Sequence, residues 1–232
     1  MKRIFLTMLL LLISCTTEDT LSPVDNPIFT ESSCALPCWY GITVGKTTRE
    51  ELFDVLDGMS LVNQDSITLT ESVVLYDEHV YFTMGKGTKF LEVEGSDPVS
   101  QDYLWTGQID ILNGKVMRLV LSGGLGLTMQ DVVDIFGTPS YVIPYFTRGG
   151  SNIEVELISP TRGVDFSCRL ADLESELTPD TKIGVLTIFE AELYSDMVEN
   201  KQFMFAIIRA PNDLEKYAWK GYGKIVDYWY VR

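Results

Sequence analysis

The sequence predicts an α+β fold made of two tandem repeats, each a helix followed by an antiparallel meander of strands. Two capped amphipathic helical patterns, which begin at Thr48 and Thr128, lie 80 residues apart. Each pattern is followed by several apolar runs of strand length, separated by polar or Gly-containing turns. A helix packed on one face of its own sheet would complete each unit.

The first helical pattern begins with Thr48 and Glu51 at the spacing of a capping box. Apolar residues then recur with the period of one helical face: Leu52, Val55, Leu56 and Met59. The second pattern has Thr128 and Asp131 at the capping positions and ends at residues 137–139, Gly-Thr-Pro, because Pro cannot continue a helix. Chance similarity between two capped helices is the alternative to a true repeat.

The predicted strands are short. A tight hairpin is expected at Asn113-Gly114, because both residues tolerate positive φ. In the first half the strands span residues 67–75, 80–84, 90–93, 103–112 and 115–121. In the second half they span residues 141–146, 153–158, 164–170, 183–189, 203–208 and 224–231, with a polar excursion at 171–182.

The N-terminus has the pattern of a bacterial lipoprotein signal. Lys2 and Arg3 precede an apolar run at residues 4–13, which is too short for a membrane-spanning helix of about 20 residues. The run ends in Leu-Ile-Ser-Cys, which resembles the site where a Cys is lipidated and becomes the new N-terminus. We therefore expect residues 1–14 to be a signal peptide and Cys15 to carry the lipid. An ordinary cleaved signal is the alternative.

The rest of the chain divides into a tether and two halves. Residues 15–33 are expected to hold the lipidated Cys and a flexible linker, because they are rich in Thr, Ser, Pro and acidic residues. Residues 34–121 would form the first repeat and residues 122–232 the second. Both would lie outside the cytoplasm, on the cell surface or facing a periplasm.

The charge of the chain limits its partners. The sequence has 18 Lys and Arg against 33 Asp and Glu, and loss of the signal removes two positive charges and changes the formal charge from −15 to −17. Such an excess of acid argues against a nucleic-acid partner, because phosphate contacts need clustered Lys and Arg. The expected membrane contact is therefore the lipid anchor and not a basic patch.

Cys34 and Cys38 flank Ala-Leu-Pro and are expected to form a disulfide, because Cys pairs outside the cytoplasm tend to be oxidised. Pairing with Cys168 is the alternative, and a redox role would need tighter Cys-x-x-Cys spacing. The single His, His79, is placed in a strand and leaves little room for a multi-His metal site. No metal and no cofactor are expected.

Residues 131–139, Asp-Val-Val-Asp-Ile-Phe-Gly-Thr-Pro, resemble the helix-to-strand corner of BamE-like lipoproteins. Two such units in tandem resemble the beta-lactamase inhibitor protein fold. Residues 34–48 also resemble uncharacterised bacterial lipoproteins that open with a Pro-Cys-Trp-x-Gly-Ile segment. The resemblance covers the chain from about Trp39 onward and implies a non-catalytic envelope role, although this chain is longer than BamE and duplicated.

The expected function is binding, without catalytic residues. Exposed aromatic side chains contact protein and carbohydrate partners, and the candidates are Trp39, Tyr40, Trp219, Tyr222 and Trp229. Packing in the core is the alternative for these residues. The sequence thus predicts a membrane-anchored extracytoplasmic lipoprotein that binds or scaffolds a protein or envelope component. Two alternatives stay open: a glycan hydrolase with paired carboxylates, and a purely structural envelope lipoprotein.

Overall fold

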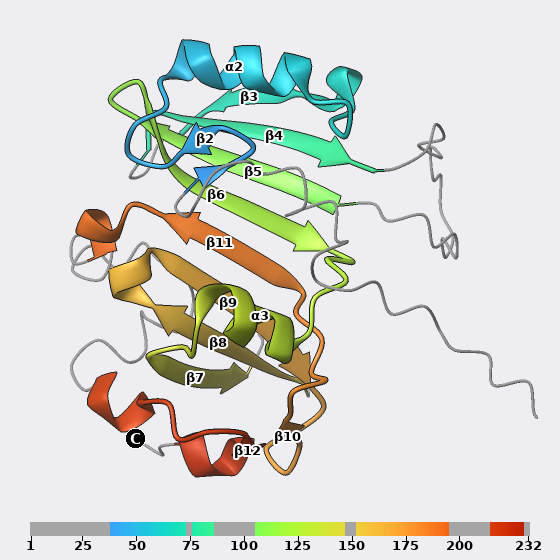
Figure 1. The fold of residues 1–232 in the computed structure, drawn as a ribbon, viewed down its shortest axis with the longest axis vertical. Helices are drawn as coiled ribbons and strands as arrows, with labels where there is room; N and C mark the ends of the chain where they lie inside the picture. Colours follow the sequence, from blue (N-terminus) through green and yellow to red (C-terminus); the bar gives the residue numbers. More distant parts are fainter. Residues whose placement is uncertain (1–37, 73–75, 86–104, 147–151, 195–213, 230–232) are drawn as a thin grey trace, which may run out of the picture.

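The computed structural model describes residues 38–72, 76–85, 105–146, 152–194 and 214–229 (Figure 1). Its centre is an antiparallel sheet of eight strands in the order β3-β4-β5-β6-β11-β9-β8-β7. The first four span Thr68–Glu71 (β3), Glu78–Met84 (β4), Trp105–Leu112 (β5) and Lys115–Gly123 (β6). The other four span Tyr141–Phe146 (β7), Ile153–Ser159 (β8), Val164–Leu170 (β9) and Val185–Phe189 (β11).

The described residues contain two α-helices, α2 (Arg49–Gly58) and α3 (Met129–Phe136). Both begin at the predicted residues, and a reciprocal capping box at Thr48 and Thr128 satisfies the free backbone N–H groups there. Two short ribbons pair β1 (Cys38–Trp39) with β2 (Ile42–Thr43) and β10 (Glu176–Leu177) with β12 (Gly223–Lys224). The 3₁₀ helices are Gln64–Ser66 (η2), Pro160–Arg162 (η3), Ala191–Leu193 (η4), Leu214–Tyr217 (η6) and Ile225–Tyr228 (η7).

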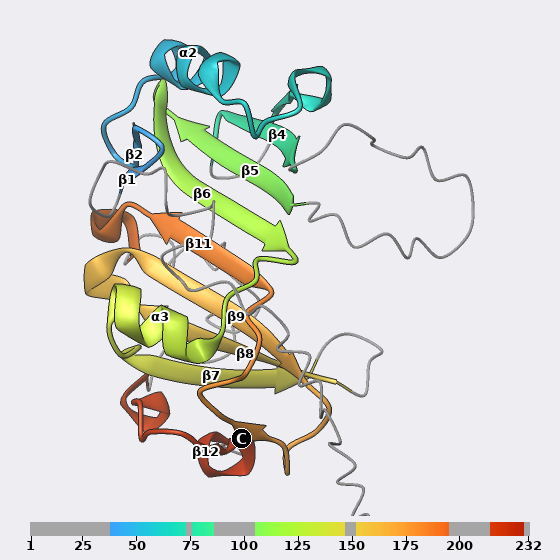
Figure 2. The same ribbon diagram turned by 45° about the vertical axis from the view of Figure 1, so that its right-hand side comes forward.

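The predicted fold class, α+β with two tandem helix-then-meander repeats, is wrong. The described part of the chain is mostly β, with one large antiparallel sheet and only two α-helices. β11 pairs with β6 on one side and β9 on the other, so both halves of the chain share one hydrogen-bonded ladder (Figure 2). The sequence pattern identifies extended segments, but it does not say which strand edges pair.

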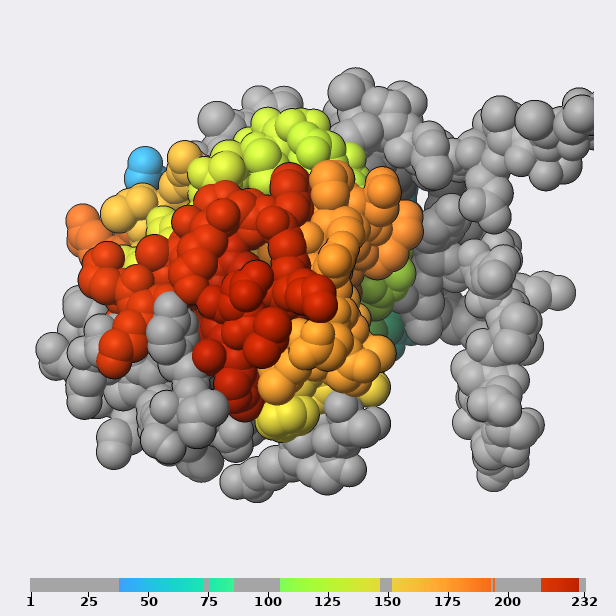
Figure 3. All heavy atoms as spheres, turned by 90° about the horizontal axis from the view of Figure 1, so that it is seen from below, coloured from blue at the N-terminus to red at the C-terminus, as the bar shows by residue number. Residues whose placement is uncertain are grey.

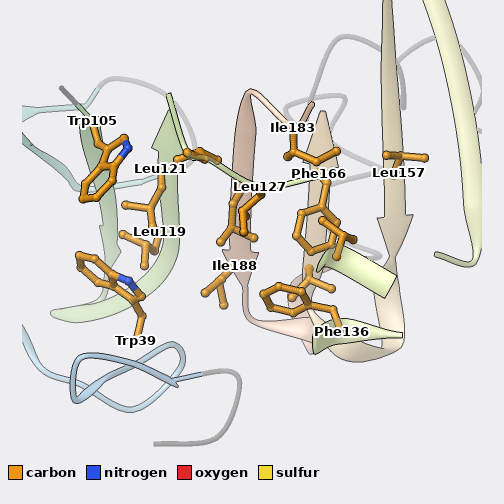
Figure 4. Packing of buried hydrophobic residues seen from close by; sticks show 14 of the residues in the cluster. Trp39, Trp105, Leu119, Leu121, Leu127, Phe136, Leu157, Phe166, Ile183 and Ile188 are labelled. Atoms are coloured by element: carbon orange, nitrogen blue, oxygen red, sulfur yellow. The ribbon is translucent and has the colours of Figure 1, made fainter. Parts of the chain in front are cut away.

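One apolar core runs along the sheet. Across the β6–β11 junction, Leu119 lies opposite Ile188 and Leu121 opposite Leu186, and all four side chains are buried. Figure 4 shows this layer extending from Trp39 at one end to Leu157 at the other. Leu52 and Leu56 of α2 and Val132 and Phe136 of α3 belong to the same cluster. The two halves therefore bury their apolar side chains against one another as well as against their own helices.

The C-terminal segment differs from its prediction. Residues 224–231 were expected to form a strand, but η7 occupies Ile225–Tyr228. Gly221 and Gly223 have positive φ, which turns the backbone before η7. The Tyr228 hydroxyl then accepts a hydrogen bond from the Lys220 N–H (2.9 Å) and donates one to the Gly221 carbonyl (2.6 Å). These bonds fold the segment back on itself.

Several predicted segments lie outside the described residues. These are the signal peptide (1–14), the tether (15–33) and the strands at 90–93 and 203–208. The predicted boundary between residues 121 and 122 falls inside β6, which is continuous from Lys115 to Gly123.

Candidate functional site

Three of the predicted aromatic residues, Trp219, Tyr222 and Trp229, come from residues 214–229 at one end of the molecule. Figure 3 shows this end, where residues 214–229 (red) lie beside the segment around β10 (orange). Phe146 at the end of β7 contacts Trp229, and Val226 of η7 is a further exposed apolar residue of the same segment. We call these five residues the aromatic edge: Phe146, Trp219, Tyr222, Val226 and Trp229.

The aromatic edge is held by ring contacts and is partly open to solvent. Phe146 meets Trp229 edge-on with ring centroids 5.0 Å apart, and Trp219 meets Tyr222 in the same way at 5.5 Å. Phe146 is 43% exposed, and Tyr222 and Val226 are each 39% exposed. Apolar side chains of this size at the surface offer area that a partner could bury.

Backbone contacts fix the aromatic edge to the sheet. The Trp219 N–H donates to the Ser140 carbonyl (2.9 Å), and Ala218 forms a β-bridge with Tyr141 of β7. β7 is the last strand in the sheet order, so the segment packs along a sheet edge. The geometry of the edge therefore depends on rigid elements and not on a loop alone.

The other two aromatic candidates lie elsewhere. Trp39 is 2% exposed and stacks on Phe82 of β4, with ring centroids 6.3 Å apart. Tyr40 occupies the turn between β1 and β2 with a φ of 50°, is half-buried, and meets Trp39 edge-on at 5.0 Å. The structure thus places Trp39 in the core and leaves Tyr40 as its neighbour, far along the chain from the aromatic edge.

Of the cysteines with predicted roles, only Cys38 is described. It is buried at the start of β1, whereas Cys15 and Cys34 lie outside the described residues, so lipidation and the Cys34–Cys38 disulfide stay predictions. Cys168 is a free, buried residue of β9, and burial raises the pKa of its thiol to about 12. A thiol so rarely ionised is a poor nucleophile.

The sheet face opposite the core carries a polar network that sequence reasoning missed. Asp110 of β5 is fully buried, and its carboxylate accepts from Gln108 Nε2 (2.7 Å) and from Arg118 Nε. His79 Nδ1 lies 2.6 Å from Asp110 Oδ1, the oxygen that also accepts from Gln108, whereas Arg118 bonds to Oδ2. His79 is a strand residue of β4, as predicted, and its ring is oriented by a buried carboxylate.

Farther along the same face lie two further buried acids, Glu156 of β8 and Asp165 of β9. They are 4% and 2% exposed. Thr187 of β11 lies directly opposite Asp165 in the strand pairing and is fully buried. Among the described residues, Glu156 Oε2, Asp165 Oδ1 and Thr187 Oγ1 have no hydrogen-bond partner. We call Glu156, Asp165 and Thr187 the carboxyl cluster.

Burial governs the ionisation of the carboxyl cluster. The pKa of Glu156 is raised to about 8, mainly by loss of solvent; a hydrogen bond from the Tyr145 hydroxyl (3.5 Å) lowers it, and the neighbouring charge of Glu154 raises it. The pKa of Asp165 is also raised, first by burial and then by the charge of Glu156. A carboxyl group that leaves water must be neutralised by a proton or balanced by a positive charge.

The carboxyl cluster could not be read from the sequence. In β8, acidic residues alternate with apolar ones, which is the pattern of a strand with one solvent-facing side. The pattern therefore predicts exposed acids at Glu154 and Glu156. Only Glu154 is partly open, with a side chain 14% exposed and paired to the largely exposed Arg169.

Among the residues that the structure describes, no three His, Cys, Asp or Glu side chains converge as a metal site. No described helix is long and apolar enough to cross a membrane. Comparisons with protein-family models, curated proteins and solved structures found no match. The resemblance to BamE-like lipoproteins therefore stays a prediction, and function has to be argued from the chain itself.

Proposed function

We propose that the protein is a membrane-anchored extracytoplasmic lipoprotein that binds a protein or envelope component without catalysing a reaction. The anchor rests on the sequence around Cys15, and the binding role rests on the aromatic edge. Sites of this kind gather rigid aromatic side chains that lose little conformational entropy on binding.

The observation that carries the binding role is the exposure of Phe146, Tyr222 and Val226, large apolar side chains from β7 and from the segment 214–229 that packs along it. The segment 214–229 also carries charged side chains: Lys224 pairs with Glu174 at 3.0 Å, and Lys220 Nζ donates to the Asp227 carbonyl at 2.6 Å. An apolar centre with a charged rim is the usual anatomy of a binding surface.

The hydrolase alternative needs two carboxyls that a glycan can reach. Glu156 and Asp165 are two described acids that come together, but they are 4% and 2% exposed. A glycosidic oxygen has no contact with groups buried to that extent. The aromatic edge, not the buried pair, is therefore the better basis for a function.

The anchor is tested by fractionation and mass spectrometry of the mature N-terminus. We expect a lipid-modified Cys15 and a membrane-bound protein, and we expect Cys15→Ser to release the protein from the membrane fraction. Cys168→Ser is the matched control, because Cys168 lies in β9 and should not affect anchoring. An unmodified N-terminal residue on the wild-type protein would exclude the lipid anchor.

The binding role is tested by photo-crosslinking in the native membranes. A benzoyl-phenylalanine at position 222 should give a discrete crosslinked product. The matched control is position 69 on β3, since Leu69 is 42% exposed but lies on the strand at the opposite end of the sheet order. Crosslinking at both positions alike, or at neither, would contradict a specific aromatic edge and favour the structural alternative.

A further inference from the structure

The carboxyl cluster presents several buried oxygen atoms to one another. In the β8–β9 pairing, Ile158 lies opposite Asp165, and Glu156 is two residues from Ile158 on the same strand face. Glu156 and Asp165 are therefore diagonal neighbours on one face, and Thr187 adjoins Asp165 across the β9–β11 pairing. The Tyr194 hydroxyl is also buried and has no hydrogen-bond partner among the described residues. It lies close enough to Asp165 and Glu156 for their charges to raise its pKa.

The two arginines near this face form their ion pairs with other acids. Arg118 bonds to Asp110, and Arg169 pairs with Glu154 at 2.5 Å. Within the described ranges, neither Glu156 nor Asp165 has an ion pair. Two buried carboxyls without a partner cation cost several kcal/mol each if they ionise in an apolar surrounding.

The oxygen atoms of the carboxyl cluster limit the kind of cation that could bind there. The carboxyl cluster offers only carboxylate and hydroxyl oxygens, which are the ligands of hard cations. Nitrogen and sulfur ligands are not offered to the carboxyl cluster. His79 is bonded to Asp110, and Cys168 lies opposite Val155 in the core on the other face of the sheet. Soft transition metals therefore have no suitable ligand here.

We propose that Glu156, Asp165 and Thr187 bind a hard divalent cation of the Ca²⁺ class between β8, β9 and β11. Two carboxylates balance the two charges of the ion, and the hydroxyls of Thr187 and Tyr194 supply neutral oxygens. Because the site has only two charged ligands, we expect a dissociation constant for Ca²⁺ of about 0.1–1 mM. This site is separate from the aromatic edge and does not depend on the binding role.

Protons compete with the cation, because its ligands must be deprotonated. The groups that face the carboxyl cluster are Glu154, Tyr145, Tyr194 and Arg118. Only Arg118 is positive, so it weakens the cation site, and the acids strengthen it. Affinity for Ca²⁺ should therefore rise with pH between pH 6 and 8.

The test uses the full mature chain, thermal unfolding and CaCl₂ against NaCl of equal ionic strength. At pH 8, 10 mM CaCl₂ should raise the Tm by about 3–6 °C, and MgCl₂ should raise it less. Glu156→Gln and Asp165→Asn should abolish the rise. Glu174→Gln is the control, since that acid is exposed, and it should retain the full rise.

Thr187→Val keeps the shape of the side chain and removes only the hydroxyl, so it should weaken Ca²⁺ binding about tenfold. This variant tests the site even if the acid variants do not fold. Terbium bound at the site should give sensitised luminescence through Tyr145 or Tyr194, and Ca²⁺ should displace it. The proposal is overturned if the wild type shows no Ca²⁺-dependent rise in Tm between pH 6 and 8. It is equally overturned if the folded variants keep that rise, because the ion then binds elsewhere.

Discussion

Arg162 donates a hydrogen bond from Nη1 to the backbone carbonyl oxygen of Phe136, the last residue of α3. Arg162 ends η3, which follows β8, so this bond ties the helix C-terminus to a turn of the sheet. The same guanidinium fills the space beside Gly137, where an added Cβ would meet it. Gly137 also has a φ of 75°, a conformation that favours glycine.

Replacing Gly137 therefore tests this junction. Gly137→Ala should destabilise the protein by about 2–3 kcal/mol, from backbone strain and the displaced guanidinium. Gly114→Ala is the matched control, because Gly114 has a φ of 71° but open space around its Cα, and should cost about 1 kcal/mol. Urea unfolding measures both, and equal losses would show that the Arg162 contact contributes nothing.

The Asp110 network should be essential to stability. Asp110→Ala removes the buried acceptor for His79, Gln108 and Arg118, and leaves partly buried donors without a partner. We expect a loss of about 3–5 kcal/mol in urea unfolding. Glu154→Ala, which breaks a pair with the largely exposed Arg169, should cost less than about 1 kcal/mol. Similar losses for both variants would contradict this ranking.

Stability should depend on pH through Glu156. Its pKa is raised to about 8 in the folded protein from an ordinary value of 4.5, so its stabilising contribution is complete below pH 4.5 and lost as pH rises to about 8. With a chelator present, unfolding free energy should fall by up to about 1.4 kcal/mol per pH unit in this window. Glu156→Gln should flatten the slope. A wild-type free energy that increases with pH across the window would refute the assignment.

The two kinds of predicted aromatic residue should respond differently to truncation. Trp39→Ala opens a cavity in the core and should cost about 3–5 kcal/mol. Tyr222→Ala removes a side chain that is 39% exposed and should cost less than about 1 kcal/mol. Thermal or urea unfolding compares them. If Tyr222→Ala proved as costly as Trp39→Ala, the aromatic edge would be a structural cluster and not a free surface.

Much of the local structure was predictable. Both helices begin at the expected capping residues, and Asn113 and Gly114 adopt the positive φ values, 53° and 71°, that a tight hairpin needs. These features depend on neighbouring residues only, so they are visible in the sequence. The prediction of a strand at residues 224–231 is wrong, because the Tyr228 hydroxyl bonds back to the backbone of residues 220 and 221. The spacing of apolar residues in the sequence does not indicate such a contact.

The sequence by itself determined the capped starts of the helices, the tight hairpin and the acidic charge of this protein, because each follows from the order and type of nearby residues; it also predicts a lipid anchor at Cys15. Only the tertiary structure decided that β6 and β11 join both halves in one sheet, and that Trp39 lies in the core while Tyr222 lies at the surface. It alone brought Glu156, Asp165 and Thr187 together from three strands. Strand pairing and burial depend on which distant segments meet, and that choice is made by packing over the whole chain.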